Sequence, residues 1–173
     1  MKSAPTIGYG DFEAILAELH GIPEHGRKAF RARLRVMRDA RIPSVARPGK
    51  GARVSYTFED LWEAHLALHL EQFGLPLERV RYVIEDSDGK RRWFKLMRRC
   101  EANHSCDALA FMVSLRFHGD AQDKKRSADS VIIPSDQLNE ARRFHDAGGA
   151  RVYAVINLSK LARECESAFQ NAG

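Results

Sequence analysis

The sequence contains few cysteines and no long apolar run. Its three cysteines, Cys100, Cys106 and Cys165, are too few and too irregularly spaced for a disulfide framework, which favours a reducing compartment. No stretch is apolar over enough residues to span a bilayer, and Lys2 is not followed by the apolar segment of a secretory signal. From these absences we expect a cytoplasmic protein that does not associate with membranes.

The composition is ordinary in every respect except charge. The chain has 173 residues, of which 44% are hydrophobic and 29% are charged, as is typical of a globular domain or of two small ones. Its net charge of +5 indicates an anionic partner. Composition alone does not distinguish among DNA, RNA and an acidic lipid surface.

Acidic residues are nearly absent from the stretch between Arg27 and Tyr56. It contains ten lysines and arginines but a single acidic residue, Asp39, so it holds more than the net charge of the whole chain. At about 100° per residue, one face of a helix here carries four arginines with a lysine at its edge: Arg27, Arg31, Arg35, Arg38 and Lys28. An apolar stripe lies beside that face and consists of Phe30, Leu34 and Met37, with Val36 and Ala40 extending it. One side therefore suits a core and the other suits phosphates, as in an element that reads a DNA groove.

The segment after this helix predicts a basic hairpin. Ile42-Pro43 ends the helix, because proline lacks a backbone donor and restricts the residue before it. Two short extended pieces joined by a Gly-rich turn follow, with Arg47, Lys50 and Arg53 along them. Such a wing would carry cations to a sugar-phosphate backbone. The alternative is that the arginines only solubilise an exposed helix, but solvated faces usually mix both signs of charge.

The basic helix is flanked by further helices. Phe12 to His20 predicts an amphipathic helix capped by Asp11, and a turn separates it from the basic helix over residues 24–41. This outline is that of a helix-turn-helix, and an αα-hairpin without a nucleic-acid role has the same outline. Thr57 and Asp60 form a capping-box signature at the start of the next helix.

Two runs in this half of the chain carry a family resemblance. Residues 51–61 (GARVSYTFEDL) and 73–80 (FGLPLERV) resemble the end of the wing and the following turn of MerR-type winged helix-turn-helix transcription regulators. Leu34-Arg35 is similar to the Leu-Arg that precedes two tyrosines in that family, at which positions this chain has Val36 and Met37. The resemblance covers roughly residues 12–85.

The resemblance implies which part of the domain each of several residues belongs to. Arg35 would contact phosphate from the recognition helix, and Arg53 and Tyr56 would belong to the wing and its base. The residues that we expect at the DNA interface are, in sequence order, Arg27, Lys28, Arg31, Arg35, Arg38, Arg47, Lys50, Arg53 and Tyr56.

Histidines and cysteines raise the question of a metal site. His65 and His69 are four residues apart, but no third ligand is evident in the sequence, so we interpret them as histidines at the core edge or on the surface. Cys100, His104 and Cys106 are close in sequence but lack a fourth ligand. We therefore expect no metal ion and no cofactor.

The second half of the chain changes character after a polar boundary at residues 85–89. Residues 90–99 (KRRWFKLMRR) predict a helix that either docks on a partner or contacts phosphate. Alternating apolar residues in 108–117, a short strand at 131–133, a helix through Leu138, a strand at 151–157 and a helix at 158–169 predict a β-β-α-β-α module. It shows no phosphate loop, nucleophile-base pair or paired carboxylates, so we expect no enzyme.

The sequence therefore predicts an α+β protein of two parts. Residues 11–86 would form a winged helix-turn-helix domain, and residues 90–173 a module for dimerisation or sensing. We expect a sequence-specific, nucleoid-associated transcription regulator that binds double-stranded DNA as a homodimer and can contact RNA polymerase. The alternative is a non-catalytic adaptor of phage or plasmid type, whose basic face binds an acidic protein.

Overall fold

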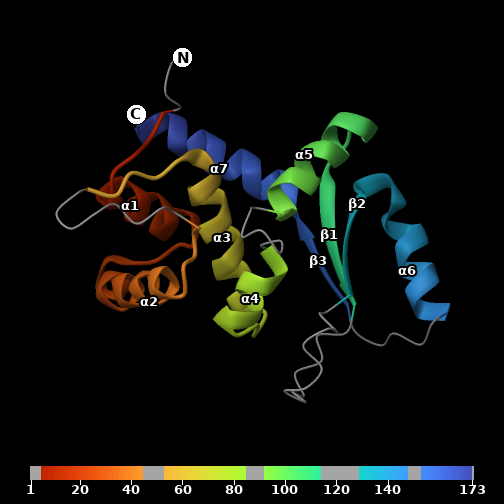
Figure 1. Cartoon of the computed structure of the whole chain (residues 1–173), viewed down its shortest axis with the longest axis horizontal. Coiled ribbons are helices and arrows are strands. Elements are labelled where there is room, and N and C mark those ends of the chain that lie inside the picture. The colour runs from red at the N-terminus through yellow and green to blue at the C-terminus, as the bar shows by residue number, and fades with distance from the viewer. Residues whose placement is uncertain (1–4, 45–52, 85–91, 114–128, 148–152, 173) are drawn as a thin grey trace. The chain divides into compact units, whose positions relative to one another are not determined.

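A computed structural model describes residues 5–44, 53–84, 92–113, 129–147 and 153–172 (Figure 1). The predicted wing residues Arg47 and Lys50 lie outside these ranges. The chain is an α+β protein with two compact units. The first unit comprises residues 1–81 and 161–173, and the second comprises residues 82–160. Within the described ranges, no helix is both long and apolar enough to cross a membrane.

The first unit begins with two helices joined by a short connection. Its helices are α1 (Tyr9–Leu19), α2 (Arg27–Asp39), α3 (Phe58–Gln72) and, as far as residue 81, α4 (Leu77–Ile84), and a 3-10 turn (Glu24–Gly26) precedes α2. α1 starts earlier than predicted, because Gly8 and not Asp11 occupies the N-cap. Asp11 instead lies in the first turn, where the helix dipole favours a carboxylate.

Helix α3 is buried on all sides at the centre of this unit. Every residue from Asp60 to Leu68 is buried, and α1 packs against both α2 and α3. The predicted capping box is confirmed: the Thr57 backbone N–H donates to Asp60 Oδ2 (2.7 Å), and the Asp60 N–H donates to Thr57 Oγ1 (3.3 Å). A helix with no solvent-facing side must satisfy each polar group internally.

The last helix of the chain, α7 (Leu158–Ala172), belongs to the first unit from residue 161 onward. Its buried side chains there are Leu161, Ala162, Cys165 and Phe169. The Phe169 ring meets Phe58 of α3 edge to face, with the ring centroids 6.3 Å apart. The observed division therefore differs from the expected module of residues 90–173, because this apolar stripe completes the cover of α3.

The second unit is built on a three-stranded antiparallel sheet of order β2-β1-β3. Its elements are α5 (Arg92–His104), β1 (Ala108–Val113), β2 (Asp129–Pro134), α6 (Leu138–Ala147) and β3 (Tyr153–Asn157). The predicted order of helices and strands is confirmed. Leu109 and Ile133 pack against Leu138 of α6. Residues on the other side of β1, such as Met112, are also buried, so the central strand is covered on both faces.

Helix α5 turns its aromatic and apolar side inward. Trp93 and Met97 are buried, and the helix packs against β1 and β2 (Figure 1). Lys95 and Arg99 are exposed on its other side. Trp93 and Met97 therefore serve the core of this unit, whereas Phe94 and Leu96 are half-buried.

Replacing Phe169 with alanine tests the place of α7 in the first unit. Because Phe169 is buried in that unit, we expect its loss to lower the free energy of unfolding by about 3–5 kcal/mol. Exposed Gln170→Ala is the matched control and should change it by less than about 0.5 kcal/mol. Urea unfolding is followed by the fluorescence of Trp62 in a Trp93→Phe background, so that the signal reports on the first unit. Equal midpoints for the two alanine variants would contradict the assignment.

Candidate nucleic-acid interface and histidine cluster

Helix α2 has the two sides that the sequence predicts. Phe30, Leu34 and Met37 are buried against the rest of the first unit. Lys28, Arg31, Arg35 and Arg38 are exposed, and Arg27 is half-buried with its Nε 4.0 Å from a Glu24 oxygen. The amphipathic character of α2 is therefore confirmed, and it places a row of cations at the surface.

Two of the α2 arginines are bound to carboxylates of other helices. Arg31 Nε donates to Glu13 Oε1 of α1 at 2.6 Å, and Arg33 Nε donates to Glu71 Oε2 of α3 at 2.9 Å. The Glu13 and Glu71 side chains are only 9% exposed, so both carboxylates depend on these partners. Arg31, which the sequence places among the DNA contacts, thus also joins α2 to α1.

Three small residues lie in a row on the exposed side of α2, which also carries the exposed carboxylate of Asp39. Ala29, Ala32 and Val36 are exposed at i, i+3 and i+7, and Val36 is 50% exposed. The prediction that Val36 continues the apolar surface toward the core is wrong, because it lies about 100° around the helix from Met37. This ridge, which we call the small-residue ridge, lies between the flank of Lys28 and Arg35 and the flank of Arg33.

The two tyrosines near α2 occupy different environments. Tyr56, expected among the DNA contacts, is 3% exposed and stacks on Phe12 with the ring centroids 4.0 Å apart. Its backbone pairs with that of Ile7 through two hydrogen bonds of 2.9 Å. The Tyr56 ring is thus a core residue, because stacking leaves it almost no surface for DNA.

Tyr9 is a candidate residue that the sequence analysis did not identify. It is 38% exposed and lies within electrostatic reach of Arg38 and Arg35. Burial raises the pKa of its hydroxyl, with Glu13 acting in the same direction and the arginines acting against it. The hydroxyl is therefore a neutral hydrogen-bond donor beside the cations. Of the predicted wing residues, Arg53 is described and is exposed.

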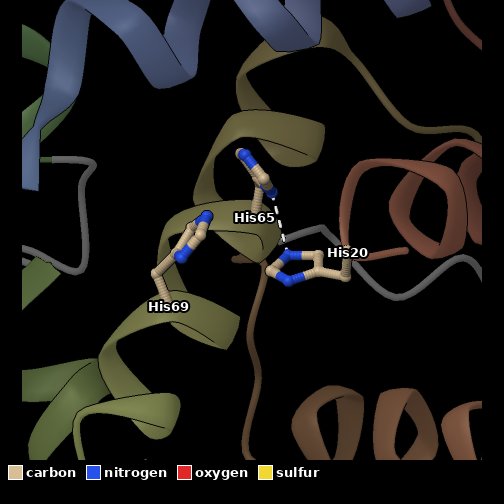
Figure 2. A group of neighbouring side chains, drawn as sticks. All are labelled: His20, His65 and His69. Atoms are coloured by element: carbon tan, nitrogen blue, oxygen red, sulfur yellow. Dashed lines mark hydrogen bonds between the residues drawn. The ribbon is translucent and has the colours of Figure 1, made fainter. Parts of the chain in front are cut away.

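Three histidines from two helices gather in the first unit (Figure 2). His20 is the C-cap residue of α1, whereas His65 and His69 lie one turn apart on the same face of α3. The ring centroids are 4.7 Å apart for His20 and His65, 4.9 Å for His20 and His69, and 4.7 Å for His65 and His69. His65 Nδ1 and His20 Nε2 are hydrogen bonded at 2.9 Å. His20 is the third member that sequence spacing did not reveal, because it is 45 residues away from His65.

A tight turn fixes the position of His20. Gly21 adopts a φ of 61°, in the left-handed region that glycine enters without strain. The Gly21 N–H donates to the Glu18 carbonyl at 2.9 Å, and the Ile22 N–H donates to the Ala17 carbonyl at 2.8 Å. These bonds close the end of α1, so the imidazole of His20 faces α3.

The environment of the cluster favours neutral imidazoles. Burial, reinforced by His20 and His69, lowers the pKa of His65 to about 3. Burial and the nearby His69 lower the pKa of His20 to about 4. Burial also lowers the pKa of His69, against the opposing effects of Glu164 and of a hydrogen bond to Gln72. At neutral pH each ring therefore keeps a nitrogen lone pair.

The other suspected ligands do not assemble in this way. Among the residues that the structure describes, His20, His65 and His69 form the group of three ligand atoms within 4.8 Å of one another. Cys100 is buried, Cys106 is half-buried and His104 is exposed, and these three do not form such a group.

In comparisons with protein-family models, curated proteins and solved structures, the chain matches none. The MerR-type resemblance therefore stays a prediction. The exposed side of α2 and the histidine cluster are the features from which a function can be inferred.

The histidine cluster predicts a loss of stability in mild acid. Below about pH 6.5 the unfolded chain protonates these rings, whereas folded His20 and His65 resist protonation down to about pH 4 and about 3. Stability should hold above about pH 6.5 and fall as the pH drops through this window, by up to about 1.4 kcal/mol per pH unit for each histidine. Urea unfolding between pH 7.5 and 4.5, in the presence of EDTA, measures this slope.

A variant isolates the contribution of the cluster from that of ordinary carboxylates. His20→Gln should give a shallower slope than the wild type, because one resisting ring is removed. His25→Gln, at an exposed histidine outside the cluster, is the matched control. A His20→Gln slope equal to that of the wild type would contradict the cause assigned here.

Proposed function

We propose that the protein is a transcription regulator of the winged helix-turn-helix type that binds double-stranded DNA through α2. The observation that carries the proposal is the composition of the exposed side of α2. There the small-residue ridge is flanked by Lys28 and Arg35, while the opposite side of the helix is fixed in the core. A helix that is held rigidly and presents cations outward has the geometry of a groove-binding element.

The small-residue ridge would allow the close approach to DNA that a helix covered with long charged side chains would not. Side chains as short as Ala29 and Ala32 let a helix approach the floor of the major groove closely. Alanine and valine methyls can contact thymine methyl groups there. Lys28 and Arg35, on one flank of the ridge, would meet the phosphates on a wall of the groove, and such contacts set affinity and register.

The order of helices supports the same proposal. α1, α2, α3 and α4 follow one another as in a MerR-type domain, with the basic segment 47–53 between α2 and α3 in the sequence. At the two positions where that family has tyrosines, Met37 is buried and Val36 lies on the ridge. In this chain, Arg35, Arg38 and the exposed Tyr9 would make the phosphate contacts instead.

One short helix reads few base pairs, so a homodimer on two half-sites would provide the specificity of a regulator. Contact with RNA polymerase would follow from that role. The second candidate is an adaptor whose basic face binds an acidic protein. The density of exposed cations on α2 supports both, whereas the small-residue ridge favours a groove.

The double variant Arg35→Ala/Arg38→Ala tests the role of α2. Two lost contacts of about 1–3 kcal/mol each should weaken duplex binding by roughly thirtyfold or more. Arg142→Ala/Arg143→Ala on α6 removes the same charge from another exposed helix and is the matched control. Fluorescence anisotropy with labelled duplex DNA measures both, and equal affinities for the two double variants would show that α2 is not the interface.

Salt dependence separates the regulator from the adaptor. Wild-type binding to duplex DNA should weaken with a log–log slope of about −0.9 for each phosphate neutralised. For Arg35→Ala/Arg38→Ala we expect a flatter log–log slope, because the contribution of about −0.9 from each of two phosphate contacts is lost. An adaptor would show no affinity for a duplex even at low salt, and that result would reject the proposal.

Ala32→Glu tests the orientation of α2. Glutamate is a good helix former, so the fold should persist, but its carboxylate would lie on the small-residue ridge and repel the groove. We expect duplex binding to fall at least as far as in Arg35→Ala/Arg38→Ala. Ala102→Glu, at an exposed position of α5, should bind as the wild type does. If Ala32→Glu bound the duplex with wild-type affinity, the DNA groove would have to contact a surface other than the small-residue ridge.

A further inference from the structure

The histidine cluster contains one buried polar atom that has no hydrogen-bond partner among the described residues. His65 is 1% exposed, and its Nε2 makes no hydrogen bond within the described ranges. The nearest carboxylate oxygen, Glu164 Oε2 of α7, lies 3.6 Å from that nitrogen, beyond a good hydrogen bond. Buried polar groups are usually satisfied, so an unpaired nitrogen next to two further imidazoles calls for an explanation.

We propose that His20, His65 and His69 bind one divalent transition-metal ion of the zinc class. Imidazole is a preferred ligand of zinc, and three histidines with one open position filled by water form a recognised zinc arrangement. The proposed site is independent of DNA binding, because its ligands come from α1 and α3 and not from α2. It also explains why three imidazoles are gathered where apolar side chains would fill the core.

The distances fit after a small adjustment. Two nitrogens bound at about 2.0–2.1 Å to a tetrahedral zinc ion lie about 3.4 Å apart. His65 Nδ1 and His20 Nε2 are 2.9 Å apart, and the nitrogen of His69 lies within 4.8 Å of its two counterparts. Side-chain rotation of His69, which is only half-buried, is enough to close the gap.

The surrounding side chains fit the outer shell of a metal site. Metal-bound histidines usually donate their second ring N–H to a carboxylate or an amide. If His65 binds through Nδ1, its Nε2 faces Glu164, and the 3.6 Å separation needs only a small shift. If His20 binds through Nε2, its Nδ1–H lies 3.4 Å from Gln72 Nε2, and turning the Gln72 amide brings its oxygen into place to accept this hydrogen bond. Each of the two rings thus has an orienting partner behind it.

The metal-free arrangement can pass to the bound one by moving one proton. When the Gln72 amide donates to His20 Nδ1, His20 Nε2 carries the proton and donates it to His65 Nδ1. Binding a metal ion through those two nitrogens moves the proton between them to Nδ1 of His20, and the Gln72 amide turns so that its oxygen accepts from that N–H. The ion would then replace a single hydrogen bond by bonds that join the end of α1 to α3.

The test uses the tag-free, full-length chain, stripped with EDTA and dialysed. Titration with Zn²⁺ is followed by calorimetry, and Co²⁺ serves as the spectroscopic probe. We expect one ion per chain, the intense visible absorption of four-coordinate Co²⁺ and a higher melting temperature with Zn²⁺. His20→Gln and His69→Gln should each weaken Zn²⁺ binding by more than about a hundredfold, and Glu164→Gln by about 10–100-fold.

Two exposed histidines provide matched controls. His25→Gln and His104→Gln change the same residue type outside the cluster and should bind Zn²⁺ as the wild type does. Circular dichroism establishes that each variant is folded, and Glu164→Gln should leave the core intact because that side chain is 40% exposed. No Zn²⁺ binding by the wild type, or wild-type affinity in both His69→Gln and Glu164→Gln, would overturn the proposal.

Discussion

The first unit depends on burying α3 from every direction. A helix with no side in water needs apolar neighbours all round, and α1 and α7 supply them. The same burial obliges its polar groups to find partners inside the protein. Asp60 binds the N-cap Thr57, and Glu63 accepts hydrogen bonds from the backbone and hydroxyl of Ser44 at 3.3 and 3.1 Å. The buried His65 likewise finds a partner inside the protein, at the end of α1.

That demand also decides how the charges of α2 are used. Buried carboxylates on α1 and α3 bind Arg31 and Arg33. These two ion pairs fix the position of α2 along its axis and its rotation about that axis. Because some of the arginines pair with carboxylates of the protein, the proposed DNA interface includes fewer arginines than the basic stretch of the sequence contains. It consists of the small-residue ridge and the cations beside it.

Sequence patterns predicted the local features well. The capping box at Thr57, the two-sided character of α2 and the strand-helix order of the second unit all follow from residues near one another in the chain. Long-range pairing was beyond those patterns. Arg31 and Glu13 are 18 residues apart and Arg33 and Glu71 are 38, and no helical or strand period links them.

Burial was misjudged for the same reason. Tyr56 is a core residue because the segment around Ile7, far away in sequence, pairs with it. α7 joins the first unit because its apolar stripe covers α3, although its sequence neighbours form the sheet. His20 completes the histidine cluster only once the turn at Gly21 has brought the end of α1 to α3. Such facts depend on the tertiary fold and not on local spacing.

The most direct measurement of the central claim is NMR of the arginine Nε–Hε groups during titration with duplex DNA. Each of these side-chain signals reports on one guanidinium. If α2 binds the duplex, the signals of Arg35 and Arg38 shift, whereas that of Arg33, held by Glu71, stays in place. Shifts confined to arginines of α5 and α6, with those of α2 unchanged, would contradict it.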